Sequence, residues 1–295
     1  MSKKFKRHKV DGFDIVNHLF FIVLVFISLF PIYLIAANAF SREWDLRNIG
    51  FAVYPLHPNI DAFKMIFRAP QQLLSSLWVS VVNSVGSTFL TVLVSALLAY
   101  AISRNDFWLK KPAMAILVGT MFFSAGTIPQ YIIRTQYYHL VDNWLVYLVP
   151  MVNAFSVFVY KAFFAQIPDS LFESATLDGA TDFQVFSKIV VPLSMPALVS
   201  QFFMGMIGSW QNYTTSMYFI SDPKMYNLEY YIQILMNNTQ LMSQNLENMG
   251  VSSDSIPLMA MRFAVVFLTV IPLITVFPLM QKYFSKGAMV GSVKG

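Results

Sequence analysis

The fold is decided by the segment Pro168-Asp-Ser-Leu-Phe-Glu-Ser-Ala-Thr-Leu-Asp-Gly-Ala-Thr-Asp-Phe183, which runs on to Ile189-Val-Val-Pro-Leu193. Long apolar runs flank it on both sides. Only 12% of the chain is charged, yet this segment carries four acids, at Asp169, Glu173, Asp178 and Asp182. A membrane protein with this much charge in one ordered loop is expected to use the loop for docking. The alternative from these residues alone is a helical hairpin that only connects two spans.

The composition predicts an integral membrane protein. The chain has 295 residues, of which 56% are apolar, and its charged fraction is half of the roughly one quarter that soluble proteins carry. Cysteine is absent, which excludes disulfides and thiolate metal sites. The four histidines are scattered without ligand spacing, so no metal site is predicted. The net charge of +5 fits Lys- and Arg-rich cytoplasmic loops better than nucleic-acid binding.

Six apolar runs are long enough to cross the hydrocarbon core of a bilayer. Backbone N–H and C=O groups must be paired inside lipid, so runs of this length are predicted to be helices. We therefore expect an all-α integral membrane protein whose first helix is retained rather than cleaved as a signal peptide. The six predicted transmembrane helices are 15–38, 74–102, 112–132, 141–165, 194–219 and 258–283.

Basic residues predict the orientation, because cytoplasmic loops are enriched in Lys and Arg. With the N-terminus inside, 13 of the 20 basic residues lie on the cytoplasmic side. Both termini and the acidic segment are then cytoplasmic. The expected organisation is a cytoplasmic N-terminal segment 1–14, a six-helix transmembrane domain 15–283 with a cytoplasmic loop 166–192, and a cytoplasmic C-terminal tail 284–295.

Two outer segments are long, 39–73 and 220–257. The second contains an apolar stripe at helical spacing. Such a stripe either packs locally or faces a partner, and the sequence leaves both open. Its members are Leu228, Tyr231, Ile232, Leu235 and Met236.

The acidic loop has the local chemistry of two helices joined by a turn. Asp169, just after Pro168, is suited to a helix N-terminus, and Gly179 can adopt the left-handed conformation that ends a helix. Thr181 or Asp182 can then cap a second helix, which we expect to end at Pro192. Two apolar stripes are predicted: Leu171, Phe172 and Ala175 on the first helix, and Phe183, Phe186, Ile189 and Val190 on the second.

The loop resembles the "EAA" loop of bacterial ABC importer permeases. The similarity lies in Glu173-Ser-Ala-Thr-Leu-Asp-Gly-Ala180, followed by Phe183, Phe186, Ile189 and Pro192-Leu-Ser-Met-Pro196. Further segments are similar to the carbohydrate-importer branch, the maltose-permease (MalG) type and its polysaccharide and oligosaccharide relatives. They are Gly126-Thr-Ile-Pro-Gln-Tyr131, Ile207-Gly-Ser-Trp-Gln-Asn-Tyr213, Tyr218-Phe-Ile-Ser-Asp222, Gln281-Lys-Tyr-Phe-Ser-Lys-Gly287 and Gly291-Ser-Val-Lys-Gly295.

The resemblance implies an ABC type I importer permease fold in a bacterial inner membrane. The first helix of the loop would be the coupling helix, which inserts into a cleft of a separate ATPase. Glu173 would pair there with a basic residue, Ala175 would allow close approach and Gly179 would provide the turn. Ser174 replaces an alanine, and an extra residue beside Asn212 departs from the pattern. The ATPase-coupling residues implied are Glu173, Ser174, Ala175, Asp178, Gly179 and Ala180.

The same resemblance implies the partners: a homologous second permease subunit, two ABC ATPase subunits, an extracytoplasmic solute-binding protein and an oligosaccharide. The chain has no phosphate-loop motif and no catalytic constellation, so we expect no enzymatic activity of its own. ATP and Mg would be bound by the ATPase subunits, and no cofactor by this chain.

Polar residues inside the spans are candidates for a translocation path, since they are costly in lipid and tend to face cavities. The alternative is that small polar residues hold helices together, which we favour for the Ser and Thr set Ser84, Ser87, Thr88 and Thr91. Aromatic faces together with amides are suited to sugars. The substrate-path candidates are Asn83, Asn153, Trp210, Gln211, Asn212 and Tyr213.

The predicted function is the membrane-spanning subunit of an ATP-driven oligosaccharide or polysaccharide importer. The main alternative is an ion-coupled secondary transporter or channel subunit. That alternative requires ionisable residues near the centres of the spans, and the predicted spans contain none there.

Overall fold

The computed structural model describes residues 12–249 and 256–292, with the backbone alone from residue 279 onwards. These described ranges contain helices and no strand, apart from a single isolated bridge between Ser41 and Pro58. The chain divides into two compact units. One comprises Met1–Arg68 with Met236–Val270, and the other comprises Ala69–Leu235 with Ile271–Gly295. The predicted N-terminal segment 1–14 lies mostly outside the described residues.

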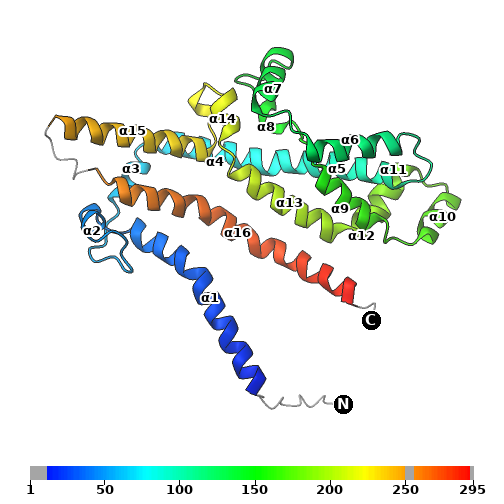
Figure 1. Ribbon diagram of the computed structural model, residues 1–295, viewed down its shortest axis with the longest axis horizontal. Helices are drawn as coiled ribbons and strands as arrows, with labels where there is room; N and C mark the ends of the chain where they lie inside the picture. Colours follow the sequence, from blue (N-terminus) through cyan, green and yellow to red (C-terminus); the bar gives the residue numbers. More distant parts are fainter. Residues whose placement is uncertain (1–11, 250–255, 293–295) are drawn as a thin grey trace. The chain divides into compact units, whose positions relative to one another are not determined.

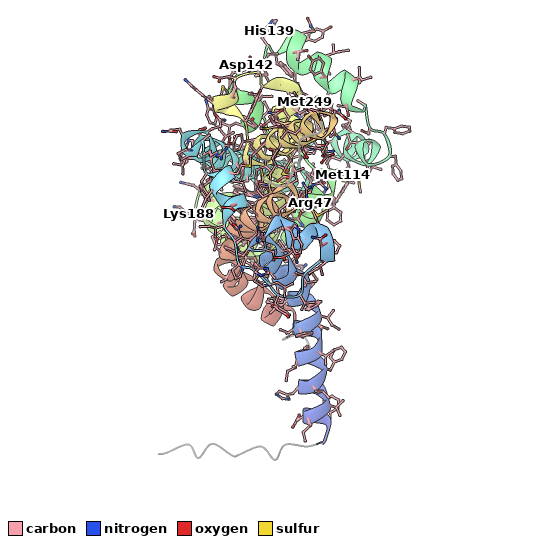
Figure 2. All side chains as sticks on the ribbon, turned by 90° about the vertical axis from the view of Figure 1, so that its left-hand side faces the viewer. Arg47, Met114, His139, Asp142, Lys188 and Met249 are labelled. Atoms are coloured by element: carbon pink, nitrogen blue, oxygen red, sulfur yellow. The ribbon has the colours of Figure 1, made fainter. Side chains whose placement is uncertain are left out.

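The first unit begins with an apolar helix whose side chains are exposed all round. In α1 (Gly12–Ala39) only the last residues are buried, and Phe20, Phe26 and Ile27 are each 60% exposed or more. Figure 2 shows side chains projecting from the ribbon along the length of this helix. An all-apolar exposed helix of this length requires lipid or another apolar chain around it.

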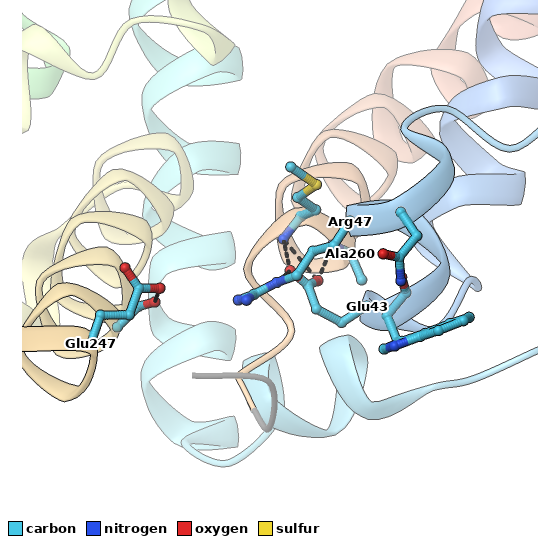
Figure 3. A network of polar contacts seen from close by, with 8 residues as sticks. Glu43, Arg47, Glu247 and Ala260 are labelled. Atoms are coloured by element: carbon cyan, nitrogen blue, oxygen red, sulfur yellow. Dashed lines mark hydrogen bonds and ion pairs between the residues drawn. The ribbon is translucent and has the colours of Figure 1, made fainter. Parts of the chain in front are cut away.

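A buried glutamate connects α2 (Glu43–Ile49) to the start of α16 (Leu258–Ser292) in the first unit. The Glu43 carboxylate accepts hydrogen bonds from the Met259 N–H at 2.9 Å and the Ala260 N–H at 3.1 Å (Figure 3). It therefore caps the first turn of α16, where unpaired N–H groups and the helix dipole favour an anion. Arg47 lies 3.2 Å away and balances the buried charge. Also in this unit are α3 (Asp61–Ile66) and the second half of α15 (Leu228–Asn248).

The second unit is built around one long continuous helix (Figure 1). The segments α4 (Pro70–Val81), the π-helical η1 (Val82–Ser87) and α5 (Thr88–Ser103) run without a break. The other helices are α6 (Lys110–Phe122), α7 (Thr127–Ile132), η2 (Ile133–Tyr137), α8 (Leu145–Leu148), α9 (Ala154–Phe164), α10 (Asp169–Leu177), α11 (Asp182–Val185), η3 (Phe186–Val190), α12 (Val191–Leu193), α13 (Met195–Trp210), α14 (Thr214–Phe219) and η4 (Pro223–Met225).

The core of this unit lies where α5 packs against α9, α13 and α6. Ala99 and Ile102 of α5 are fully buried, and so are Val157 and Tyr160 of α9. Small residues on α5 let the neighbouring backbones approach closely, as is usual for packed helices in membranes.

The structure divides three of the six expected spans. Residues 15–38, 74–102 and 258–283 fall within continuous apolar helices. Residues 112–132 and 194–219 are spanned by broken helices, since the first bends by 120° between α6 and α7 and the second is split between α13 and α14. The count of six spans is compatible with these bends. Residues 141–165 are likewise divided: Pro150, which cannot donate a backbone hydrogen bond, lies between α8 and the short apolar α9.

One further boundary differs from expectation. The backbone of α16 stays helical to Ser292, so the predicted tail 284–295 starts inside a helix. In α15 the predicted stripe is at helical spacing as expected. Leu228 and Ile232 are buried, and the Leu228 N–H donates to Ser80 Oγ at 2.7 Å. The start of the stripe therefore packs within the chain, as the first of the two alternatives predicted.

Gly205 of α13 lies against Thr88 of α5, and a Cβ at Gly205 would be 2.9 Å from the Thr88 methyl carbon. Thr88 is buried and β-branched, so it has no room to move. We expect Gly205→Val to destabilise the fold by about 1–3 kcal/mol, because it overpacks this crossing. The measurement is the thermal unfolding midpoint of the purified transporter. Gly208→Val is the matched control, since nothing lies within 4 Å of a Cβ at Gly208; an equal loss in both variants would contradict the prediction.

Candidate functional site

The acidic loop folds as the two predicted helices, and its turn depends on Gly179. Gly179 has φ +74°. Its N–H donates to the Thr176 carbonyl at 3.0 Å, and the Ala180 N–H donates to the Ala175 carbonyl at 2.9 Å. This pair of bonds is a Schellman motif, which satisfies the last carbonyls of α10 and requires the left-handed residue between them.

The second helix starts with a capping box. Thr181 Oγ1 accepts from the Gln184 N–H at 3.3 Å, and the Gln184 side chain accepts from the Thr181 N–H at 2.9 Å. Thr181, one of the two predicted caps, is therefore the N-cap. The helix passes Pro192 and ends at Leu193, followed by an 80° bend, so the expected end at Pro192 is one residue short.

The apolar stripes of the loop are partly as predicted. Ala175, Phe186 and Val190 are buried, but Phe183 is 68% exposed and Val185 is buried in its place. The prediction for Phe183 was wrong because α11 changes to π-helical geometry at Phe186, which shifts the face that points inward.

The residues implied for ATPase coupling lie on different sides of the loop. Glu173, Ser174, Asp178 and Gly179 are exposed, and Ala180 is partly buried. Ala175 is 8% exposed and belongs to the same apolar cluster as α5 and α9. The close approach that Ala175 permits is therefore to the chain's own helices.

A cleft of about 740 Å³ runs beside α10. Glu173 and Leu177 of α10 line it, together with Lys161 of α9 and the link between α5 and α6. The Arg104 guanidinium from that link lies 5.3 Å from the centre of the Phe172 ring and 3.8 Å from the Asp106 carboxylate. Leu177 is 89% exposed. The cleft thus presents acids, cations and an apolar side chain to the solvent.

A second cavity, which we call the polar pocket, has a volume of about 280 Å³. The Asn83 side chain donates to the Ser209 carbonyl at 3.0 Å, and Ser87 Oγ lies 3.3 Å from Ser209 Oγ. These bonds join η1 to α13 at one wall. The described residues that line the pocket are Asn83, Ser87, Thr91, Thr127, Gln130, Arg134, Val146, Tyr147, Val149, Met151, Ser209, Asn212, Thr214, Thr215, Tyr218 and Phe219.

Two of the six substrate-path candidates, Asn83 and Asn212, line the polar pocket, and four do not. Asn153 instead caps α9, with Oδ1 accepting from the Phe155 N–H at 2.9 Å. Trp210 is 6% exposed, and Gln211 and Tyr213 are exposed outside the lining. Asn212 Oδ1 itself accepts from the Thr214 N–H at 3.0 Å and begins α14.

Sequence reasoning missed the pocket residues that come from broken helices, among them Gln130, Arg134 and Tyr218. Gln130 and Tyr218 stand in segments that carry the family resemblance. Arg134 lies two residues beyond the predicted end of the span 112–132. The bend between α6 and α7 brings it to the pocket instead.

With both sites described, comparison with known proteins identifies the family. Residues 12–290 match the family described as "Binding-protein-dependent transport system inner membrane component". The chain belongs to this family. The membership makes it a permease component of an ABC importer in the inner membrane and gives no support to an ion-coupled transporter or channel.

Relatives cover nearly the whole chain. It is 32% identical over 283 residues to "Polygalacturonan/rhamnogalacturonan transport system permease protein YtcP" of Bacillus subtilis, covering 96% of this chain and 98% of the relative. It is 25% identical over 281 residues to "Arabinooligosaccharides transport system permease protein AraQ" of the same organism, covering 94% of each.

A solved structure shares the fold. It is a chain from a bacterial ABC transporter involved in the import of the acidic polysaccharide alginate. The TM-score is 0.75 at 24% identity, and the match covers 96% of this chain and 100% of that one. The all-α ABC importer permease fold expected from the sequence is confirmed.

The Gly179 turn generates a testable difference between two variants. Nothing lies within 4 Å of a Cβ at Gly179, so a substitution meets conformational strain and not crowding within this chain. We expect Gly179→Val to cost about 1–3 kcal/mol and to tilt α10, with loss of ATPase co-purification. Gly179→Asn should be milder, because Asn tolerates positive φ. Equal loss in both variants would argue for a steric role of the missing side chain at a partner surface.

Proposed function

We propose that this chain forms half of the translocation path of an ATP-driven importer of oligosaccharides or polysaccharides. Two related permeases are named for the transport of polygalacturonan and rhamnogalacturonan and of arabinooligosaccharides. In this chain, the proposal of a carbohydrate substrate is supported by the polar pocket. Asn83 and Asn212 supply amides there, Thr91 supplies a hydroxyl, and Tyr218 and Phe219 supply aromatic rings. Carbohydrates require this combination, since their hydroxyl groups need hydrogen-bond partners and their apolar ring faces stack on aromatic rings.

The proposed assembly contains this chain, a homologous permease, two ABC ATPase subunits and an extracytoplasmic solute-binding protein. Its support is the exposed surface of α10 together with the absence of a phosphate-loop motif from the sequence. ATP and Mg are bound by the ATPase subunits. Both termini and the loop 166–192 face the cytoplasm, in keeping with the distribution of Lys and Arg.

Transport by cells tests the function. Deletion of this chain should abolish uptake of labelled oligosaccharides, and a plasmid copy should restore it. Uptake should stop when ATP is depleted and persist when an ionophore collapses the ion gradients. The reverse pattern, or uptake unaffected by the deletion, would overturn the proposal.

Coupling to the ATPase depends on α10, where Glu173 is exposed beside the cleft. We propose that Glu173 pairs with a basic residue of the ATPase subunit, while Leu177 packs into its cleft. The remaining proposed contacts are made by Ser174, Asp178, Gly179 and Ala180. Ala175 contributes indirectly, because it packs α10 against the core.

We expect Glu173→Lys to uncouple uptake while membrane insertion is preserved. Reversing the charge replaces an attraction by a repulsion, and breaking a partly buried pair costs several kcal/mol. Glu173→Gln should show an intermediate loss. The measurements are co-elution of the ATPase subunit and substrate uptake, with Glu247→Lys on the exposed end of α15 as the control. Full uptake by Glu173→Lys would make Glu173 an ordinary solvated acid.

A further inference from the structure

The polar pocket contains one charged residue among its described lining residues, Arg134. It lies on η2, where the helix that begins at Thr127 changes to π-helical geometry. The other lining groups are neutral amides, hydroxyls and apolar or aromatic side chains. A guanidinium stays protonated in proteins, so the pocket holds a permanent positive charge.

Arg134 has no acidic partner within the described part of the chain. No Asp or Glu carboxylate among the described residues forms an ion pair with its guanidinium. Its Nη2 donates to Met151 Sδ at 3.1 Å, and thioether sulfur is a weak acceptor. The guanidinium carbon lies 5.3 Å from the centre of the Phe219 ring, which Tyr131 stacks against at 5.6 Å.

These contacts hold the guanidinium in place without neutralising it. The stacked rings fix its position, and the sulfur takes one N–H. An unpaired cation in a pocket of a membrane protein is costly, which makes a functional role the default interpretation. The structural alternative is an arginine that simply extends toward the lipid headgroups.

The neighbours of Arg134 are suited to a sugar and not to a simple anion. Gln130 and Thr127 line the pocket from the adjacent turns of α7, and Thr215 and Tyr218 line it from α14. They provide hydroxyl and amide groups and a half-exposed aromatic ring. A volume of about 280 Å³ accommodates a sugar unit or two in this chain's half of the path.

We propose that the polar pocket is a subsite for a carboxylate-bearing sugar, and that Arg134 pairs with the carboxylate of a uronate unit as it passes. A planar guanidinium binds a carboxylate through two parallel N–H···O bonds, while the neutral groups around it bind the sugar hydroxyls. This inference rests on the proposed function and narrows its substrate class to acidic glycans. Arg134 would then select sugars that carry a negative charge.

The test compares two matched probes that differ in charge: trigalacturonate and its fully methyl-esterified form. Both are given as labelled sugars to cells that carry the complete transport system. Arg134→Gln should lower uptake of trigalacturonate by about tenfold, which corresponds to about 1.4 kcal/mol, and leave uptake of the ester unchanged. Arg134→Lys keeps the charge and should lose less. Lys224→Gln, at an exposed cation outside the pocket lining, should alter neither.

A second measurement removes the solute-binding protein, which has selectivity of its own. The purified complete transporter is placed in nanodiscs, and equilibrium binding of labelled trigalacturonate is measured without the binding protein. We expect the affinity to fall by about tenfold in Arg134→Gln and to weaken with added salt in the wild type.

The outcomes separate the two proposals. The subsite is supported if Arg134→Gln loses uptake and binding of trigalacturonate but keeps uptake of the ester, while Lys224→Gln keeps both. Uptake of the sugars with no dependence on Arg134, or equal loss of both probes, overturns the subsite and leaves the importer function standing. A wild-type transporter that takes up neither these nor other oligosaccharides overturns the function itself.

Discussion

The constraint on which this structure depends is that backbone polar groups must be paired where no water is present. It forces an all-helical fold, and it also decides how the helices are broken. At three of the helix starts in the second unit, an asparagine side chain accepts a freed backbone N–H. Asn153 accepts at the start of α9, Asn212 at the start of α14 and Asn227 at the start of α15, the last from the Tyr230 N–H at 3.1 Å. Amides that a hydropathy profile treats as exceptions are therefore part of the helical framework, and they allow short helices to replace full spans.

The broken helices produce the polar pocket. A bilayer-crossing helix offers only side chains to its surroundings, whereas the ends of α7, α8 and α14 bring together residues as far apart in the sequence as Thr127 and Phe219. Polar residues that would be costly on a lipid-facing helix are sheltered there. Thr91 of α5 illustrates this, since its Oγ1 accepts from the N–H of Met151, in the break between α8 and α9, at 3.3 Å. The same feature that complicates the span count thus creates a place where a hydrophilic substrate can be accommodated.

The loop could be predicted because its turn and cap depend on residues that are close in the sequence. The pocket could not, because it depends on packing between distant segments. The Gly179 turn and the Thr181 cap depend on residues within a few positions of each other, so their identities were sufficient to predict them. The pocket depends on bends at Pro150 and between α6 and α7, whose angles arise from packing between distant segments. Asn153 shows the limit: a polar residue in an apolar run predicts a cavity or a helix cap equally well, and here it caps a helix. Arg134 could have been included only by placing the bend that precedes it.

Burial of Ala175 has a mechanical consequence. It makes α10 part of the same close-packed cluster as α9 and α5, and close-packed interiors are stiff and transmit strain. A displacement of the exposed face of α10 is then transmitted through this cluster to α9 and α5. The opposite ends of those helices adjoin Thr91 and Met151 in the wall of the polar pocket. The small side chain at position 175 lets α10 pack into this cluster, so a displacement at one surface is transmitted toward the other.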